Sequence, residues 1–426
     1  MNIKTFILFL SSLSFLHSAQ VLNSISQEPI ANATIRANTQ SYTSNEHGQF
    51  TLEGKQDLQI RALGYKRLNI QSDNDTTIHL EPFTPKALYL SYWALSSPKY
   101  RRNILSLIHE TEINTLVLDV KNSYGDIAFR GTSALAKKAG AYKKRTLKDI
   151  DSFMKTLKEM EIYTIARVVL FKDSYFAKTY PEDAILTRSG AIWSNKEGMA
   201  WANPYSPKAQ QYNLEIAVDV AKKGFDEIQF DYVRFPAYAE LEFEGNHSQE
   251  DRVNTIISFL KKARIALNPT NTFISIDTYG YACWHEGDTG IGHDLKALAP
   301  YTDYISPMLY PSSFHVGIPG LPKPLANPYK VIFDSLKHSA EQSNISPIKF
   351  RPWLQAFKDY AFDRRHFKGK EIRAQIEASE DFKTSGWLLW NPVSKFSEEG
   401  LQKAHLYEIS LKKKESGVTT DNGEEL

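Results

Sequence analysis

Cysteine is nearly absent from this 426-residue chain, in which Cys283 is the only one. A single cysteine cannot form an intramolecular disulfide, and it excludes a zinc site built from several cysteines. The 11 histidines include no HxH or HxxxH pair at the end of an expected strand, which disfavours a metal-dependent hydrolase or deacetylase. The sequence therefore predicts neither a metal site nor a cofactor.

A large net charge and a long apolar run are also missing. The formal net charge is +2, whereas a nucleic-acid-binding protein needs a basic patch that neutralises phosphates. After the first 19 residues, no apolar stretch approaches the length of about 18 residues that a membrane helix requires. We therefore expect no nucleic-acid partner and no membrane span in the mature chain. The sequence does not indicate an oligomeric state.

Residues 1–19 have the layout of a secretory signal. Lys4 supplies a positive charge, residues 6–15 form an apolar stretch, and Ser18 and Ala19 are small residues suited to cleavage. The stretch is too short and too rich in serine for a membrane helix. The sequence therefore predicts an exported protein that is periplasmic or extracellular.

Hydrophobic and aromatic side chains are plentiful. Hydrophobic residues make up 42% of the chain, and the aromatic residues include 22 Tyr and 7 Trp. Most of these side chains will belong to the core, but aromatic faces also stack on sugar rings. The composition thus favours a carbohydrate-binding protein, and the length suits about two or three domains.

Residues 20–82 show short alternating runs separated by turn residues, a spacing typical of a small antiparallel β-sandwich. The expected strands are 33–37, 49–52, 58–62, 65–70 and 76–80. Their pattern resembles the carboxypeptidase regulatory-like (transthyretin-like) domain. The resemblance implies a non-catalytic spacer or binding module, followed by a linker between Pro82 and Pro85.

From residue 86 to about residue 410, strand and helix patterns alternate, which predicts an α/β fold with parallel strands. The expected strands are 87–92, 115–121, 163–170, 227–233, 272–279, 304–309, 350–355 and 386–390. The expected helices are 99–112, 147–160, 207–223, 249–267, 292–298, 328–340, 369–382 and 398–414. Eight such units predict a (β/α)8 TIM-type barrel. An open doubly wound sheet is the alternative, and residues 411–426 are expected to be disordered.

The most informative segment is Gly224–Pro236, which reads as a buried strand ending in Asp231, Tyr232 and Arg234. Pro236 ends the strand because proline cannot donate to a sheet ladder. A carboxylate in so apolar a run is costly unless it is paired or faces a site. We interpret Asp231 as a catalytic residue at the C-terminal end of a barrel strand; a structural ion pair between Asp231 and an arginine is the alternative.

Other chemically active side chains stand at or near the ends of the remaining expected strands. Asp277 ends the fifth strand and is the second predicted catalytic acid. The predicted substrate-binding residues are Asp119, Lys121, Arg167, Tyr232, Arg234, Tyr310, Arg351, Trp353, Gln355, Trp390 and Asn391. Polar groups among aromatic platforms are the makeup of a sugar-binding cleft. Individually, Asp119 and Lys121 could instead form a structural pair, Arg351 could pair with a carboxylate, and Trp390 could be core.

A family resemblance rests on several of these motifs taken together. They are residues 225–236, 277–280, 290–293, 304–312, 351–355 and 386–391. In this order they resemble the glycosyl hydrolase-like domain family of exported bacterial proteins, a member of the barrel glycosidase superfamily. The resemblance implies a sugar-cleaving barrel from about Lys86 to Tyr407. His293 departs from the pattern, in which an amide is expected.

These observations predict hydrolysis of a polysaccharide or oligosaccharide by a carboxylate pair. Such cleavage needs one acid to protonate the leaving oxygen and another to act as nucleophile or base. We expect Asp231 to be the nucleophile or base and Asp277 the acid, with Arg234 or Arg167 holding one carboxylate ionised. Asp119 is the reserve candidate. A non-catalytic carbohydrate-binding or cell-envelope scaffold protein is the alternative function.

Overall fold

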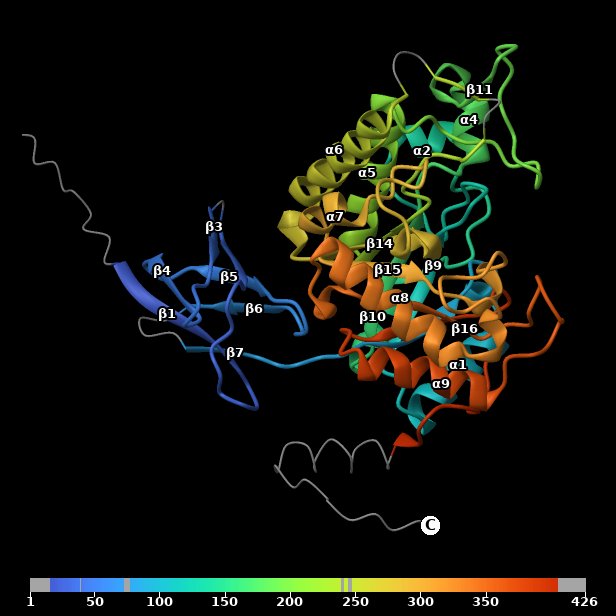
Figure 1. The fold of residues 1–426 in the computed structure, drawn as a ribbon. Helices are drawn as coiled ribbons and strands as arrows, with labels where there is room; N and C mark the ends of the chain where they lie inside the picture. Colours follow the sequence, from blue (N-terminus) through green and yellow to red (C-terminus); the bar gives the residue numbers. More distant parts are fainter. Residues whose placement is uncertain (1–15, 39, 73–76, 239–240, 244–246, 405–426) are drawn as a thin grey trace, which may run out of the picture. The chain divides into compact units, whose positions relative to one another are not determined.

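The structure is a computed structural model, and the chain divides into two compact units, with the boundary in the sequence between Phe83 and Thr84 (Figure 1). The described residues are 16–38, 40–72, 77–238, 241–243 and 247–404. Most of the predicted leader and the predicted disordered tail, 411–426, lie outside them. Within these ranges, every helix is too short or too polar to cross a lipid bilayer.

The N-terminal unit consists of two small β-sheets. Its strands are β1 (Leu16–Asn23), β2 (Thr34–Ala37), β3 (Gln40–Thr43), β4 (Gln49–Glu53), β5 (Asp57–Arg61), β6 (Leu68–Gln71) and β7 (Thr77–Leu80). One sheet has the order β4-β1-β7 and the other β3-β2-β5-β6. Val21 and Ile78 of the first sheet share one buried cluster with Ile35 and Ile60 of the second, so the sheets pack face to face as a sandwich.

The sandwich differs from the prediction in its strand pairing and in two additional strands, β1 and β3. It is not wholly antiparallel, because β1 and β7 pair in parallel. It also contains β1, which begins at Leu16 and pairs with β4 through residues predicted to belong to the leader. A cut after Ala19 would therefore shorten this strand; export stays a prediction.

The second unit is a closed parallel barrel, as predicted. Its strands are β8 (Lys86–Leu90), β9 (Thr115–Lys121), β10 (Tyr163–Val169), β12 (Glu227–Asp231), β14 (Phe273–Tyr279), β15 (Tyr304–Met308), β16 (Trp353–Gln355) and β17 (Trp387–Trp390). The ring order is β10-β12-β14-β15-β16-β17-β8-β9, which excludes the open doubly wound sheet. β16 begins three residues later than predicted, after Pro352, which cannot donate to the ladder.

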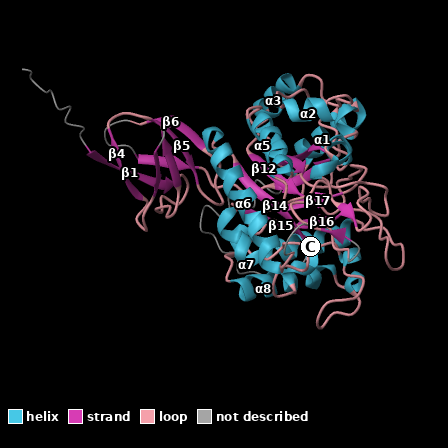
Figure 2. Cartoon of the chain, turned by 90° about the horizontal axis from the view of Figure 1, so that it is seen from above, coloured by secondary structure: helices cyan, strands magenta, loops and turns pink. Residues whose placement is uncertain are grey.

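The helices lie outside the ring of strands (Figure 2). They are α1 (Pro98–Glu110), α2 (Ala134–Ala139), α3 (Ile150–Glu159), α4 (Ser174–Thr179), α5 (Pro207–Ala221), α6 (Gln249–Leu267), α7 (Leu295–Leu298), α8 (Pro328–Ser343) and α9 (Gly369–Asp381). Proline at the first helical position starts α1, α5 and α8, where its missing N–H costs nothing. The helix predicted at 398–414 falls mostly outside the described residues. Two short strands, β11 (Leu186–Thr187) and β13 (Leu241–Glu242), pair away from the barrel.

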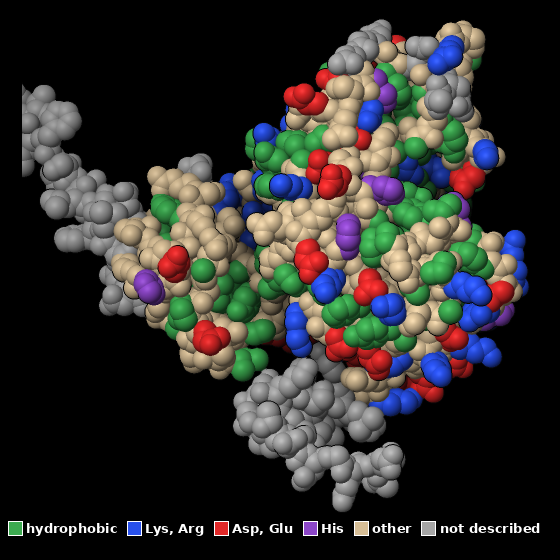
Figure 3. Space-filling view, in the orientation of Figure 1, with side chains coloured by type: hydrophobic (Ala, Val, Ile, Leu, Met, Phe, Trp, Pro, Cys, Tyr) green, Lys and Arg blue, Asp and Glu red, His purple; other side chains and the backbone are tan. Residues whose placement is uncertain are grey.

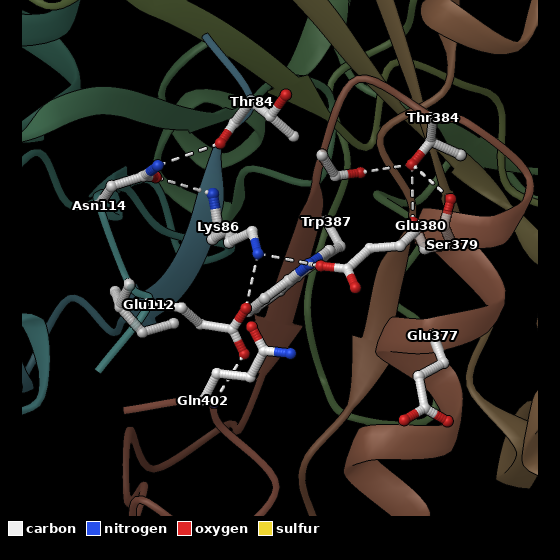
Figure 4. A network of polar contacts seen from close by, with 12 residues as sticks. Thr84, Lys86, Glu112, Asn114, Glu377, Ser379, Glu380, Thr384, Trp387 and Gln402 are labelled. Carbon is white, nitrogen blue, oxygen red and sulfur yellow. Dashed lines mark hydrogen bonds and ion pairs between the residues drawn. The ribbon is translucent and has the colours of Figure 1, made fainter. Parts of the chain in front are cut away.

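A polar network ties the elements together at the N-terminal ends of the barrel strands (Figure 4). Lys86 Nζ, at the start of β8, lies 2.6 Å from Glu112 Oε2 and 3.0 Å from Glu380 Oε1 of α9. Glu112 also accepts hydrogen bonds from Arg373 and from the backbone N–H of Gln402. The network is remote from the opposite, C-terminal ends of the strands, where barrel enzymes place their chemistry.

Candidate active site

The register of three neighbouring strands brings a group of charged side chains to the C-terminal end of the barrel. Asp119 on β9 pairs in register with Arg167 on β10. Asp231 ends β12, and the residue before it pairs with Ile276, which precedes Asp277 on β14. The two predicted catalytic acids are therefore level with each other on adjacent strands.

Arg167 is the centre of this group. Its Nη1 donates to Asp119 Oδ1 at 2.5 Å, and its Nε donates to Asp231 Oδ2 at 3.0 Å. Its Nη2 donates to the same Asp231 oxygen. The same Nε also lies 4.0 Å from Asp277 Oδ2. One guanidinium nitrogen is therefore within 4.0 Å of a carboxyl oxygen of each predicted catalytic acid. Arg167, rather than Arg234, is thus the cation that holds Asp231.

The two acids have different electrostatic surroundings. Burial raises the pKa of Asp277 well above its usual value, and the negative charge of Asp231 raises it further. The Arg167 cation and a hydrogen bond from Trp353 oppose this rise only in part. Asp277 is therefore suited to hold a proton, whereas Asp231 accepts hydrogen bonds from two guanidinium nitrogens of Arg167.

The chain turns sharply immediately after Asp231. Tyr232 has a φ of +49°, in the left-handed region that a bulky side chain rarely adopts. Its backbone N–H donates to Asp231 Oδ1 at 2.6 Å, so the turn itself orients the carboxylate. Strain of about 1–3 kcal/mol at such a residue is characteristic of functional sites.

Aromatic side chains fix the positions of the acids. Trp353 Nε1 donates to Asp277 Oδ1 at 2.7 Å, and the Tyr89 hydroxyl donates to Asp119 Oδ2 at 2.9 Å. The Trp390 ring stacks on Tyr89 with centroids 3.9 Å apart. The guanidinium carbon of Arg167 lies 5.2 Å from the centre of the Trp390 ring. The charged side chains at the strand ends are thus packed against aromatic rings.

These residues open into a cavity of about 890 Å³, near the upper end of the range of about 300–1,000 Å³ common for ligand sites. The predicted residues that line it are Arg167, Asp231, Tyr232, Arg234, Asp277, Tyr310, Trp353, Trp390 and Asn391. Tyr310 is buried beside both acids, whose charges, after burial itself, raise the pKa of its phenol.

Residues 87–396 match the family model described as "Putative glycosyl hydrolase domain". The chain belongs to this glycosyl hydrolase domain family. No curated protein matches the chain.

Two solved glycoside hydrolase structures share the barrel fold. The PgaB (BpsB) glycoside hydrolase domain from Bordetella bronchiseptica is 13% identical, with a TM-score of 0.54 over 74% of this chain and 95% of its own. The α-L-fucosidase isoenzyme 2 from Paenibacillus thiaminolyticus is also 13% identical, with a TM-score of 0.50 over 79% of this chain and 51% of its own. A hypothetical protein from Ruminiclostridium thermocellum is 32% identical over 45% of this chain and 96% of its own, with a TM-score of 0.41.

Lys121 does not line the cavity of the glycosyl hydrolase domain, contrary to the prediction. A register shift against β10 places an extra residue in β9 between Asp119 and Lys121. Because strand side chains alternate between faces, one extra residue turns Lys121 away from Asp119. Lys121 Nζ instead lies 2.8 Å from Asp173 Oδ2 and donates to the Val169 carbonyl, fully buried. The pairing of Asp119 with Lys121 is excluded as well.

Arg351 and Gln355 also lie away from the cavity. Arg351 precedes β16 and forms a buried ion pair with Glu227, the first residue of β12, so it belongs to the floor of the barrel. The Gln355 side chain donates to Ser312 Oγ at 2.7 Å and is fully buried. Neither side chain is placed to contact substrate from the cavity. Asp119 lies beneath Arg167 and outside the cavity lining, where it orients the guanidinium.

Two of the predicted cavity residues serve partly to shape loops. Asn391 donates to the Ala356 carbonyl at 2.7 Å and accepts from two backbone N–H groups of its own loop. The Arg234 guanidinium lies over the rings of Trp201 and Tyr232, at 5.2 and 5.1 Å. No described carboxylate pairs with Arg234.

Sequence reasoning missed the loop that follows β16. Cavity residues from this loop are Ala356, Phe357, Lys358, Tyr360, His366 and Phe367. Phe357 and Tyr360 stack in parallel, with centroids 6.1 Å apart, and Tyr360 is half exposed. The one feature of the sequence that could have indicated this loop as part of the site is the group of aromatic residues directly after the seventh expected strand. A second cavity of about 500 Å³ shares Tyr279 with the first.

Proposed function

We propose that this protein is an exported glycoside hydrolase that cleaves a polysaccharide through Asp277 and Asp231. The observation that carries the proposal is the pairing of a buried acid whose pKa is raised with an arginine-bound carboxylate, both lining one aromatic cavity. The family of the domain and the barrels of the glycoside hydrolases from Bordetella bronchiseptica and Paenibacillus thiaminolyticus support it.

In this mechanism Asp277 donates its proton to the glycosidic oxygen as the bond to the anomeric carbon breaks. Asp231, which accepts hydrogen bonds from Arg167, attacks the anomeric carbon or removes a proton from the attacking water. Arg167 lies close to both acids. Its charge would stabilise Asp277 as the carboxylate that forms after proton transfer.

A polymeric substrate agrees with the extent of the site. The first cavity has a volume of about 890 Å³, and Tyr279 lines both this cavity and the second. Tyr279 and Tyr360 present exposed aromatic surface at the cavity, on which sugar faces can stack. The N-terminal sandwich would act as a carboxypeptidase regulatory-like spacer or binding module.

One observation favours a second candidate, a carbohydrate-binding or cell-envelope scaffold protein without catalysis. Both oxygens of Asp231 already accept hydrogen bonds, from Arg167 and from the Tyr232 backbone. A carboxylate with both oxygens hydrogen-bonded in this way can have a structural role at the strand end instead of a catalytic one.

Replacing either acid tests the two candidates. Asp277→Asn and Asp231→Asn should each lower hydrolysis of a glycan library by at least about a hundredfold, because a general acid alone contributes about 10²–10⁴-fold. The control is Asp363→Asn, an exposed aspartate paired with Arg365, which should retain full activity. Glycan binding without turnover in the native protein would favour the scaffold candidate.

A further inference from the structure

The acids of the first cavity have little negative charge to offer a ligand. Asp231 is the carboxylate that Arg167 binds through two nitrogens. Burial raises the pKa of Asp277, which favours its neutral form. No other acidic side chain lines this cavity in the described part of the chain.

Arg234 lies in the same cavity without an acidic partner among the described residues. It is half-buried, and one of its nitrogens donates to the Phe235 carbonyl at 3.1 Å. The rings of Trp201 and Tyr232 hold the guanidinium in place. An arginine has five N–H donors in a planar fork, so most of them remain available to a ligand.

Three more basic side chains line the cavity: Lys358, His366 and Lys395. All three are exposed, and none forms an ion pair with a described acidic residue. The acids of the adjoining loop are engaged elsewhere: Asp359 accepts from Ser312 and from backbone N–H groups, and Asp363 pairs with Arg365.

The surface of the barrel unit gives a contrast. Basic and acidic side chains are interspersed on the face drawn in Figure 3, and the whole chain carries a net charge of only +2. An overall excess of basic residues in the chain therefore does not explain the basic side chains of the cavity lining. A concave site with an excess of one sign of charge raises the local concentration of ligands of the opposite sign.

We propose that the cavity binds a negatively charged glycan, whose sugar units carry carboxylate or sulfate groups. The guanidinium fork of Arg234 matches either group in a bidentate manner, and Lys358 and Lys395 would contact neighbouring charged units. This inference rests on the proposed function for the identity of the site, because it names the class of polysaccharide that the same cavity takes.

The test compares polymers that differ only in charge. Binding of the Asp277→Asn protein is measured by calorimetry with polygalacturonate and its methyl ester, and with dextran sulfate and dextran. We expect about tenfold or tighter binding of at least one charged polymer over its neutral counterpart, with affinity that falls as salt rises. Which charged polymer binds more tightly distinguishes carboxylate from sulfate recognition. Equal or weaker binding of both charged polymers would overturn the inference.

A charge-reversal variant tests the residues themselves. Lys358→Glu combined with Lys395→Glu should weaken binding of the charged polymer about tenfold or more and leave binding of its neutral counterpart unchanged. Lys148→Glu combined with Lys370→Glu is the matched control, because these exposed lysines lie outside the cavity lining. If both double variants lose affinity equally, cavity recognition is refuted.

Failure of this inference and failure of the proposed function give different results. Charge-dependent binding by the native protein without hydrolysis would support the inference and refute the hydrolase. Hydrolysis of a neutral glycan, with no binding of either charged polymer, would support the hydrolase and refute the inference.

Discussion

At the scale of single residues, Asp231 and Asp277 have the same side chain but different surroundings. Asp231 is bound by the Arg167 guanidinium, whereas Asp277 is buried and lies 4.0 Å from the same guanidinium. Burial dominates the pKa of Asp277 and raises it. This difference in surroundings is the basis for proposing Asp277 as the acid and Asp231 as the nucleophile or base.

Trp353 provides a test of this assignment through pH dependence. Its indole N–H bonds the carboxylate form of Asp277 and so lowers the pKa of that group. Trp353→Phe removes this influence, and the pKa of Asp277 should rise further. The acid would then stay protonated to higher pH, so the alkaline limb of the kcat/KM profile should move upward in pH.

The matched control is Trp387→Phe, because Trp387 is a buried tryptophan outside the cavity lining whose N–H donates to Glu380. The alkaline limb of the kcat/KM profile of Trp387→Phe should stay at the native pH, although this substitution removes the same side-chain volume from the core as Trp353→Phe. An unchanged limb in Trp353→Phe would mean that another group donates the proton.

At the scale of secondary-structure elements, the bulge in β9 decides which side chains face the barrel interior. Asp119 points inward to Arg167 and Tyr89, whereas Lys121 contacts the carbonyls of Val169 and Leu170. One inserted residue thus divides a pair that a regular strand would keep on one face. The result is an inward acid that supports the site and an outward cation that supports the fold.

Lys121→Met should therefore reduce stability rather than substrate affinity. It leaves Asp173 as a buried carboxylate without its cation, which costs about 3–5 kcal/mol for a broken buried pair. Urea unfolding should show this loss, while KM measured on the folded fraction should remain native. A raised KM at native stability would restore Lys121 to the binding site. Lys155→Met, which removes an exposed pair with Glu159, is the control and should change little.

At the scale of the whole molecule, the sandwich and the barrel are separate units, each with its own hydrophobic core. The cavity is lined entirely by residues of the barrel unit. Independent cores joined through a short linker are typical of domains that fold alone.

Deleting residues 20–82 should therefore leave a folded barrel with near-native turnover on a small soluble substrate. Circular dichroism would report the fold, and hydrolysis kinetics the activity. A lower affinity for polymer alone would assign the sandwich to substrate binding. An inactive or unfolded truncation would show that the sandwich completes the barrel.

The sequence by itself determined the barrel fold, because eight alternating strand and helix patterns indicate a parallel (β/α)8 architecture. It also placed Asp231 and Asp277 at the ends of adjacent strands, since side chains that end parallel strands meet at one edge. Leader cleavage and export rest on the sequence alone.

Only the tertiary structure decided which of the predicted residues meet. The bulge in β9 turned Lys121 outward, and the position of Arg351 before β16 placed it at the barrel floor. The loop of residues 356–367 reached the cavity through its aromatic and basic side chains. Local pattern cannot specify such contacts, because a one-residue shift in register exchanges the faces of a strand and a loop has no periodicity to read.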